Sequence, residues 1–140
     1  MLGDGELQVG EVWEGVMFSA HHQLDNLCAI IDYNKMQSDD LNENIIGLEP
    51  IKDKWIAFKW NVIEINGHDF EEIGSAFEMA RNSKGQPTVI IAHTIKGKGV
   101  SYMEGSPLWH GSVKLSDEDL IQALIELGAS QSEIKEILNG

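Results

Sequence analysis

Residues 3–34 read GDGELQVGEVWEGVMFSAHHQLDNLCAIIDYN, and this stretch decides the fold. After a glycine-flanked aspartate, apolar residues recur at helical spacing from Val12 onward, which predicts a helix over residues 11–22. The continuous apolar run that follows predicts a short buried strand over residues 26–32. A turn, a helix and a buried strand in this order are typical of α/β proteins with parallel sheets.

The rest of the chain repeats this alternation. We expect further helices over residues 51–58 and 70–80, and capping boxes at Ser116 and Ser130 predict two terminal helices. Right-handed βαβ units then give a three-layer α/β/α fold, with parallel strands near residues 27–32, 61–65 and 88–92. Met1-Leu2 is too short for the strand that should lead into Gly3. We expect one domain over residues 1–140. Its parts are a motif region (3–37), a glycine-rich active-site loop (94–114) and C-terminal helices (116–139).

Composition excludes several classes of function. Ten basic against 23 acidic residues give a net charge of −13, which repels nucleic acid and anionic lipid. Any diphosphate site therefore needs a bound cation, or basic groups from another chain. The single cysteine, Cys28, permits no internal disulfide and no thiolate zinc cluster, which fits a cytoplasmic protein. The longest apolar run, residues 27–31, falls far short of the roughly 20 residues of a membrane span.

Two oxygen-bearing side chains are expected to meet at one edge of the sheet. Asp4 begins the first crossover and Asn34 follows the strand that ends it, so both lie at the carboxyl ends of strands, where ligands of such sheets bind. Oxygen ligands suit a hard cation such as Mg²⁺, which also takes oxygens from phosphates and water. The alternative is that both residues only cap turns.

This arrangement resembles the thiamine-diphosphate motif, in which Gly-Asp-Gly is followed about thirty residues later by Asn. More widely, residues 3 to about 127 resemble the N-terminal half of transketolase, in its separately encoded bacterial and archaeal form. The matching stretches are GDGELQVGEVWE (3–14), LDNLCAIIDYNKMQ (24–37), LEPIKDKW (48–55), INGHDFEEI (65–73), PTVIIAHTIKGKGVSYME (87–104) and WHG (109–111).

The resemblance implies a role for five residues. The side chains of Asp4 and Asn34 and the backbone carbonyl of Met36 would bind Mg²⁺ or another divalent cation such as Ca²⁺, and the Gly5 amide would meet the diphosphate of thiamine diphosphate. His110 would lie beside the diphosphate and the substrate and transfer protons. The alternative for His110 is an exposed loop histidine with no role.

Two lysines of the glycine-rich loop admit two interpretations. Lys96 and Lys98 either attract a sugar phosphate or are simply solvated. The histidines outside the WHG stretch are expected to be structural, namely His21, His22, His68 and His93.

The function that the resemblance implies is a component of transketolase. It would transfer a two-carbon ketol unit between sugar phosphates, as a step of the pentose phosphate pathway, through thiamine diphosphate. One alternative is a component of a deoxyxylulose-phosphate-synthase-like enzyme, although the GELQ stretch and the LEP and KW of residues 48–55 favour transketolase. The other is a non-catalytic interaction module derived from the same fold.

The chain departs from the family's pattern in two ways. Val9 stands where the family has a glutamate, which together with the counterpart of Glu14 links paired active sites. The sequence also matches only the second half of the domain, so the isolated chain is expected to be inactive. As a subunit or fragment it would form an oligomer with a chain supplying the first half and with the C-terminal, pyrimidine-binding subunit. Trp13, Met17 and Trp55 are expected on the apolar face left for such partners.

Overall fold

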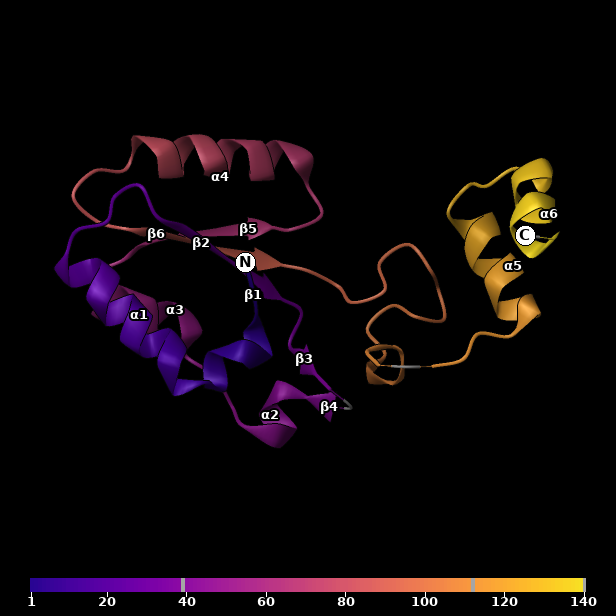
Figure 1. The fold of residues 1–140 in the computed structure, drawn as a ribbon, viewed down its shortest axis with the longest axis horizontal. Coiled ribbons are helices and arrows are strands. Elements are labelled where there is room, and N and C mark those ends of the chain that lie inside the picture. Colours follow the sequence, from indigo (N-terminus) through magenta and orange to yellow (C-terminus); the bar gives the residue numbers. More distant parts are fainter. Residues whose placement is uncertain (39, 112, 140) are drawn as a thin grey trace. The chain divides into compact units, whose positions relative to one another are not determined.

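The computed structural model describes residues 1–38, 40–111 and 113–139, and it is shown in Figure 1. Asp39, Ser112 and Gly140 lie outside the described residues. Of these, Ser112 belongs to the expected glycine-rich loop, and all three belong to the expected domain of residues 1–140. The chain forms two compact units, residues 1–94 and 95–140, and each is described by itself.

The first unit is built on a four-stranded sheet in which every neighbouring pair is parallel, as predicted. The strand order is β1-β2-β6-β5. The expectation that Met1-Leu2 is too short for a strand was wrong: a two-residue strand there pairs with β2, because two backbone partners suffice for a ladder. The strands are β1 (Leu2–Gly3), β2 (Cys28–Tyr33), β5 (Asn61–Asn66) and β6 (Thr88–His93).

Helices cover both faces of this sheet, so the predicted three-layer α/β arrangement is confirmed (Figure 1). Alternate residues of β6 point to opposite faces, as the pleat of a strand requires. Val89 and Ile91 lie on the face covered by α1 and α3, whereas Ile90 and Ala92 lie on the face covered by α4. The covering helices are α1 (Gly10–His21), α3 (Ile51–Ala57) and α4 (Phe70–Asn82).

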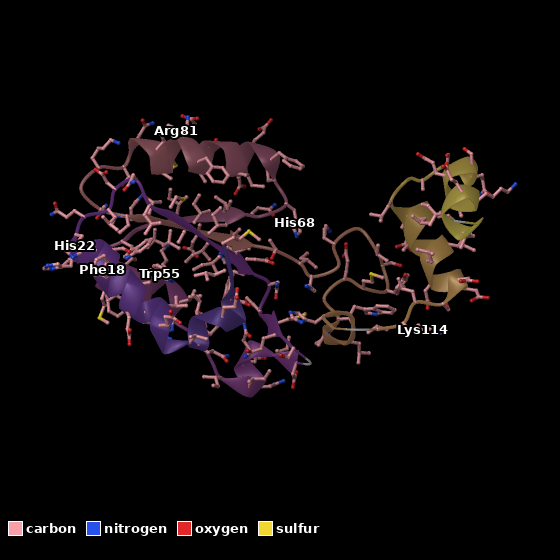
Figure 2. The ribbon with its side chains drawn as sticks, in the orientation of Figure 1. Phe18, His22, Trp55, His68, Arg81 and Lys114 are labelled. Atoms are coloured by element: carbon pink, nitrogen blue, oxygen red, sulfur yellow. The ribbon has the colours of Figure 1, made fainter. Side chains whose placement is uncertain are left out.

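Tryptophans fill the core between the sheet and the two helices on one of its faces, α1 and α3. Trp55 is 1% exposed, so its expected place on an exposed apolar face was wrong. Its ring lies 5.6 Å from that of Trp13, which is partly buried, and 4.8 Å from that of Trp60. Figure 2 shows Trp55 within the unit and Phe18 on the outer side of α1. The sequence could not separate these cases, because every apolar residue of a short helix carries the same signal.

Several short elements, one after β1 and three between β2 and α3, were not predicted. A 3-10 helix follows β1, and a small antiparallel hairpin and one helical turn follow β2. Such elements are too short to show a hydrophobic period, so the sequence gives no sign of them. They are η1 (Asp4–Gln8), β3 (Met36–Gln37), β4 (Asp40–Leu41) and α2 (Asn42–Ile45).

The second unit begins with the glycine-rich loop and ends with the two predicted helices. Its elements are η2 (Pro107–Trp109), α5 (Asp117–Glu126) and α6 (Gln131–Asn139). The Ser116 capping box is present, and Ser130 makes the corresponding bonds with Glu133. In the part of the chain that the structure describes, no helix is long and apolar enough to cross a membrane.

Candidate functional site

The candidate site lies where β1 and β2 end side by side. Gly3 is in register with Asp32, so the residues that follow these strands emerge at the same edge of the sheet. Asp4 follows β1 at once and is 0% exposed. Its carboxylate accepts the backbone N–H of Gly5 at 2.9 Å and that of Lys35, beyond the end of β2, at 2.6 Å. The Asp4 side chain therefore ties the two strand ends together.

Asn34 is oriented by hydrogen bonds at both ends of its amide. Its Nδ2 donates to Asp32 Oδ2 at 3.3 Å, and its Oδ1 accepts the backbone N–H of Met36 at 2.9 Å. The other oxygen of Asp32 accepts the hydroxyl of Thr94, which follows β6. Because Asp32 can only accept, it fixes which end of the Asn34 amide carries the nitrogen. Asp32 and Thr94 are thus the support of Asn34.

The turn between Asn34 and Met36 depends on an unusual backbone conformation at Lys35. Its φ is 67°, in the left-handed region that lysine seldom adopts. Two bonds hold it there: its N–H donates to Asp4, and its carbonyl accepts the N–H of Asn42 at 2.9 Å. Strain of this kind gathers at ligand-binding sites, where the surrounding structure maintains it.

Asp4 is a charged group in an unfavourable place. Burial raises its pKa above the ordinary value, and the negative charge of Asp32 raises it further. The Asn42 side chain and the backbone N–H groups of Lys35 and Gly5 act in the opposite direction. A buried carboxylate with another carboxylate nearby calls for a cation, and an oxygen donor of this kind suits Mg²⁺ or Ca²⁺.

The residues around Asp4 fit a metal site with mixed oxygen donors. Among the described residues, no three His, Cys, Asp or Glu side chains gather as a metal cluster, so the cation would need amide and backbone oxygens as well. Asn34 and Met36 place such oxygens in the turn tied to Asp4. Gly5 is also required, because a Cβ there would lie 2.6 Å from Gln37 Cβ.

The structure brings together Asp4, Gly5, Asn34 and Met36 in the first unit, whereas His110 belongs to the second. His110 directly follows η2, is partly exposed, and donates its N–H to Pro107 O at 3.0 Å. In the same unit the Lys98 ammonium pairs with Glu104 at 3.2 Å, so this lysine has a structural contact within the loop.

Sequence reasoning missed the residues that support the site. Asp32 and Thr94 end or follow predicted strands and carry polar groups, and this signal could have identified them. Asn42 and Gln37 gave no such signal, because the unpredicted β3–β4 hairpin and α2 bring them to the site. Both are notable for buried side-chain nitrogens that make no hydrogen bond within the described residues.

Oxygen donors at the carboxyl ends of parallel strands, beside a glycine that permits close approach, define a cofactor-binding α/β domain. Residues 1–138 match the family model described as transketolase, thiamine diphosphate binding domain. The chain therefore belongs to the family of transketolase N-terminal, thiamine-diphosphate-binding domains, as the resemblance in its sequence implied.

Relatives and solved structures agree with this assignment. The chain is 46% identical to the 6-deoxy-6-sulfo-D-fructose transketolase subunit of Clostridium sp. strain MSTE9, over 91% of this chain and 46% of that subunit. It is 42% identical to an apulose-4-phosphate transketolase subunit of Phocaeicola vulgatus, over 84% of this chain and 42% of the relative. The chain thus spans less than half the length of these relatives.

Among solved structures, the transketolase of Campylobacter jejuni superposes with a TM-score of 0.83 and 36% identity. The match covers 92% of this chain and 20% of the Campylobacter chain. The α/β fold is therefore that of transketolase over nearly all of this chain.

Proposed function

We propose that this chain binds thiamine diphosphate and a divalent metal as a component of a transketolase that transfers two-carbon ketol units between sugar phosphates. The observation that carries the proposal is the fully buried Asp4 carboxylate, held at the strand ends beside the Asn34 turn in a chain of this family. A charge buried in this way is costly unless a cation accompanies it.

The roles follow from the contacts around Asp4. Asp4, the Asn34 side chain and the Met36 carbonyl would hold Mg²⁺ or Ca²⁺, and the Gly5 backbone would approach the diphosphate. When bound, thiamine diphosphate supplies the carbon nucleophile that carries the ketol unit, while the protein orients it. Asp32, held by Thr94, would accept the Asn34 amide nitrogen and so leave the Asn34 oxygen available to the metal.

His110 would act on the substrate side of the cofactor as a proton-transfer group, and Lys96 would favour the approach of a phosphate. The support for both is the resemblance of the WHG and KGKG stretches to the family.

Substrates and partners are proposed at the level of the class. The relatives named above are transketolase subunits for a sulfosugar and for a sugar phosphate, and their names favour a transketolase over a deoxyxylulose-phosphate synthase. We propose sugar phosphates as substrates, the cytoplasm as location, and partner chains that supply the rest of the cofactor site, including a pyrimidine-binding subunit.

Calorimetric titration with thiamine diphosphate and Mg²⁺, on the chain alone and with a candidate partner subunit, tests the proposal. The wild type should bind the cofactor only when the metal is present. Asp4→Ala should lose this binding by more than the about 10- to 100-fold typical of groups that merely support a metal ligand. Asp53→Ala, which changes an exposed aspartate of α3, is the matched control. Equal affinity of Asp4→Ala and wild type would remove the metal role.

A further inference from the structure

The side chain of Asn42 is polar and buried, and the described residues give it no hydrogen bond. It is 5% exposed, and within that part of the chain neither its Nδ2 nor its Oδ1 has a hydrogen-bond partner. Leaving a buried donor or acceptor unpaired destabilises the fold, so such a group requires a physical explanation. An apolar residue of similar size would avoid this cost, which suggests that the amide is retained for a contact it makes in another state.

The backbone places Asn42 directly beside the candidate metal ligand. Its N–H donates to the carbonyl of Lys35, whose own N–H donates to the Asp4 carboxylate. The Asn42 side chain lies close enough to Asp4 to favour its ionised form, although the two groups lack the geometry of a formed hydrogen bond.

Several polar groups near Asn42 make contacts of their own. Asn42 lines a pocket of about 520 Å³ whose polar lining includes Tyr33, Lys35 and Glu49. Glu49 accepts the hydroxyl of Tyr33 and the backbone N–H of Ile51, and the Lys35 ammonium lies 5.5 Å from the centre of the Tyr33 ring. The Asp4 carboxylate accepts one backbone N–H on each oxygen and can accept more.

We propose that Asn42 is a positioning residue for the metal site, whose amide nitrogen donates to the Asp4 carboxylate and holds it in the orientation that binds the cation. This inference rests on the proposed function. It assigns to Asn42 the work of an outer-shell group, which orients a metal ligand and stabilises its charge without touching the metal. The backbone donors at Gly5 and Lys35 fix the position of the carboxylate, and Asn42 adds a side-chain donor from the α2 side.

Asn42→Leu tests the inference, because it keeps the side-chain size and removes only the amide. Metal affinity is measured with Mn²⁺ and thiamine diphosphate by counting free Mn²⁺ by electron paramagnetic resonance, on the chain alone and with a partner subunit. We expect affinity to fall about 10- to 100-fold. The melting temperature should stay unchanged or rise by up to about 5 °C, since an unpaired buried amide has been removed.

A purely structural role would not produce a loss of affinity without a loss of stability. Asn44→Ala, in the same helical turn but exposed and bonded to Asp40, should leave both quantities unchanged. Wild-type affinity in Asn42→Leu, or a loss of affinity accompanied by a comparable loss of stability, would overturn the positioning role alone. Absence of metal-dependent binding by the wild type in both preparations would overturn the proposed function and this inference with it.

Discussion

At the scale of single residues, the site depends on a conformation that its sequence does not favour. Lys35 has a positive φ between two of the proposed metal-binding residues, and residues in this region cost about 1–3 kcal/mol. Asp4 and Asn42 hold the two sides of this residue's backbone. These two hydrogen bonds offset the cost of the Lys35 conformation and keep the Asn34 and Met36 oxygens in one turn.

We predict different effects for two substitutions of Lys35. Lys35→Gly should leave stability within about 1 kcal/mol of wild type and preserve Mn²⁺ and cofactor affinity, because glycine adopts positive φ freely. Lys35→Val should destabilise the chain by a further about 1–3 kcal/mol and weaken metal binding, since a β-branched residue resists this conformation. Urea unfolding and Mn²⁺ titration measure the two quantities. Tolerance of valine would show that the backbone strain has no part in the site.

The position of the proposed metal-binding residues at one edge of the sheet was predictable from the sequence, whereas that of their neighbours was only partly so. Asp4 and Asn34 each follow an element that a hydrophobic pattern reveals, so the topology alone brings them to one edge. Asn42 reaches the site through a hairpin with strands of two residues each and a single helical turn, which depend on backbone hydrogen bonds rather than on a pattern of side chains. Local sequence therefore carries no information about this contact.

At the scale of elements, the N-terminus of α4 is fixed by one side chain. Asp69 Oδ1 accepts the N–H of Glu71 at 2.8 Å and that of Glu72 at 3.1 Å. Asp69→Ala should destabilise the chain by about 1 kcal/mol because two helix donors lose their partner, and Asp69→Ser should restore most of the loss. Chemical denaturation of the three proteins gives the comparison. An alanine variant as stable as wild type would show that the cap is dispensable.

The glycine-rich loop is attached to α5 by Glu126. Its carboxylate accepts the Ser101 backbone N–H at 2.5 Å and hydroxyl at 2.6 Å, and these bonds lower the pKa of Glu126, as does a bond from Gln122. Bonds to the ionised form stabilise the folded loop above the ordinary glutamate pKa of 4.5. The stabilisation is lost as the pH falls below that value through the lower pKa of the folded state.

Protection of loop residues 97–105 from amide hydrogen exchange should therefore decrease as the pH falls from about 5 to 3, after correction for the intrinsic exchange rate. Glu126→Gln should reduce the protection already at pH 7 and abolish most of its pH dependence. Glu136→Gln, in α6, serves as the control. Equal protection in Glu126→Gln and wild type at pH 7 would contradict the role of this carboxylate as the loop's anchor.

At the scale of the whole chain, the parallel sheet and its covering helices could be predicted because long apolar periods record which face of an element is buried. Placement of single apolar residues could not be predicted in the same way. Trp55 and Met17 both lie on helices that pack against the sheet, yet one is 1% exposed and the other 49% exposed. What separates them is the direction of each helix face, which only the packed structure defines.

Exposed apolar residues on α1 point to association with other chains. Met17 is 49% exposed and Phe18 61% exposed, and β1 is an edge of the sheet with only two residues. Exposed apolar groups and open strand edges are each typical of interfaces. Val9, 51% exposed, and Glu14 lie at or on the same helix, where the family resemblance expects contacts between paired sites.

We therefore predict that the chain sediments at micromolar concentration with a mass above its 15.6 kDa, either with copies of itself or with partner subunits. Replacing both Met17 and Phe18 by Glu should shift the material toward the monomer, because two charges would have to be desolvated in the interface. Phe70→Glu, which alters a residue of α4 that is 88% exposed, should leave the mass unchanged. A wild-type monomer that also binds thiamine diphosphate tightly would show that partners are dispensable for the cofactor site.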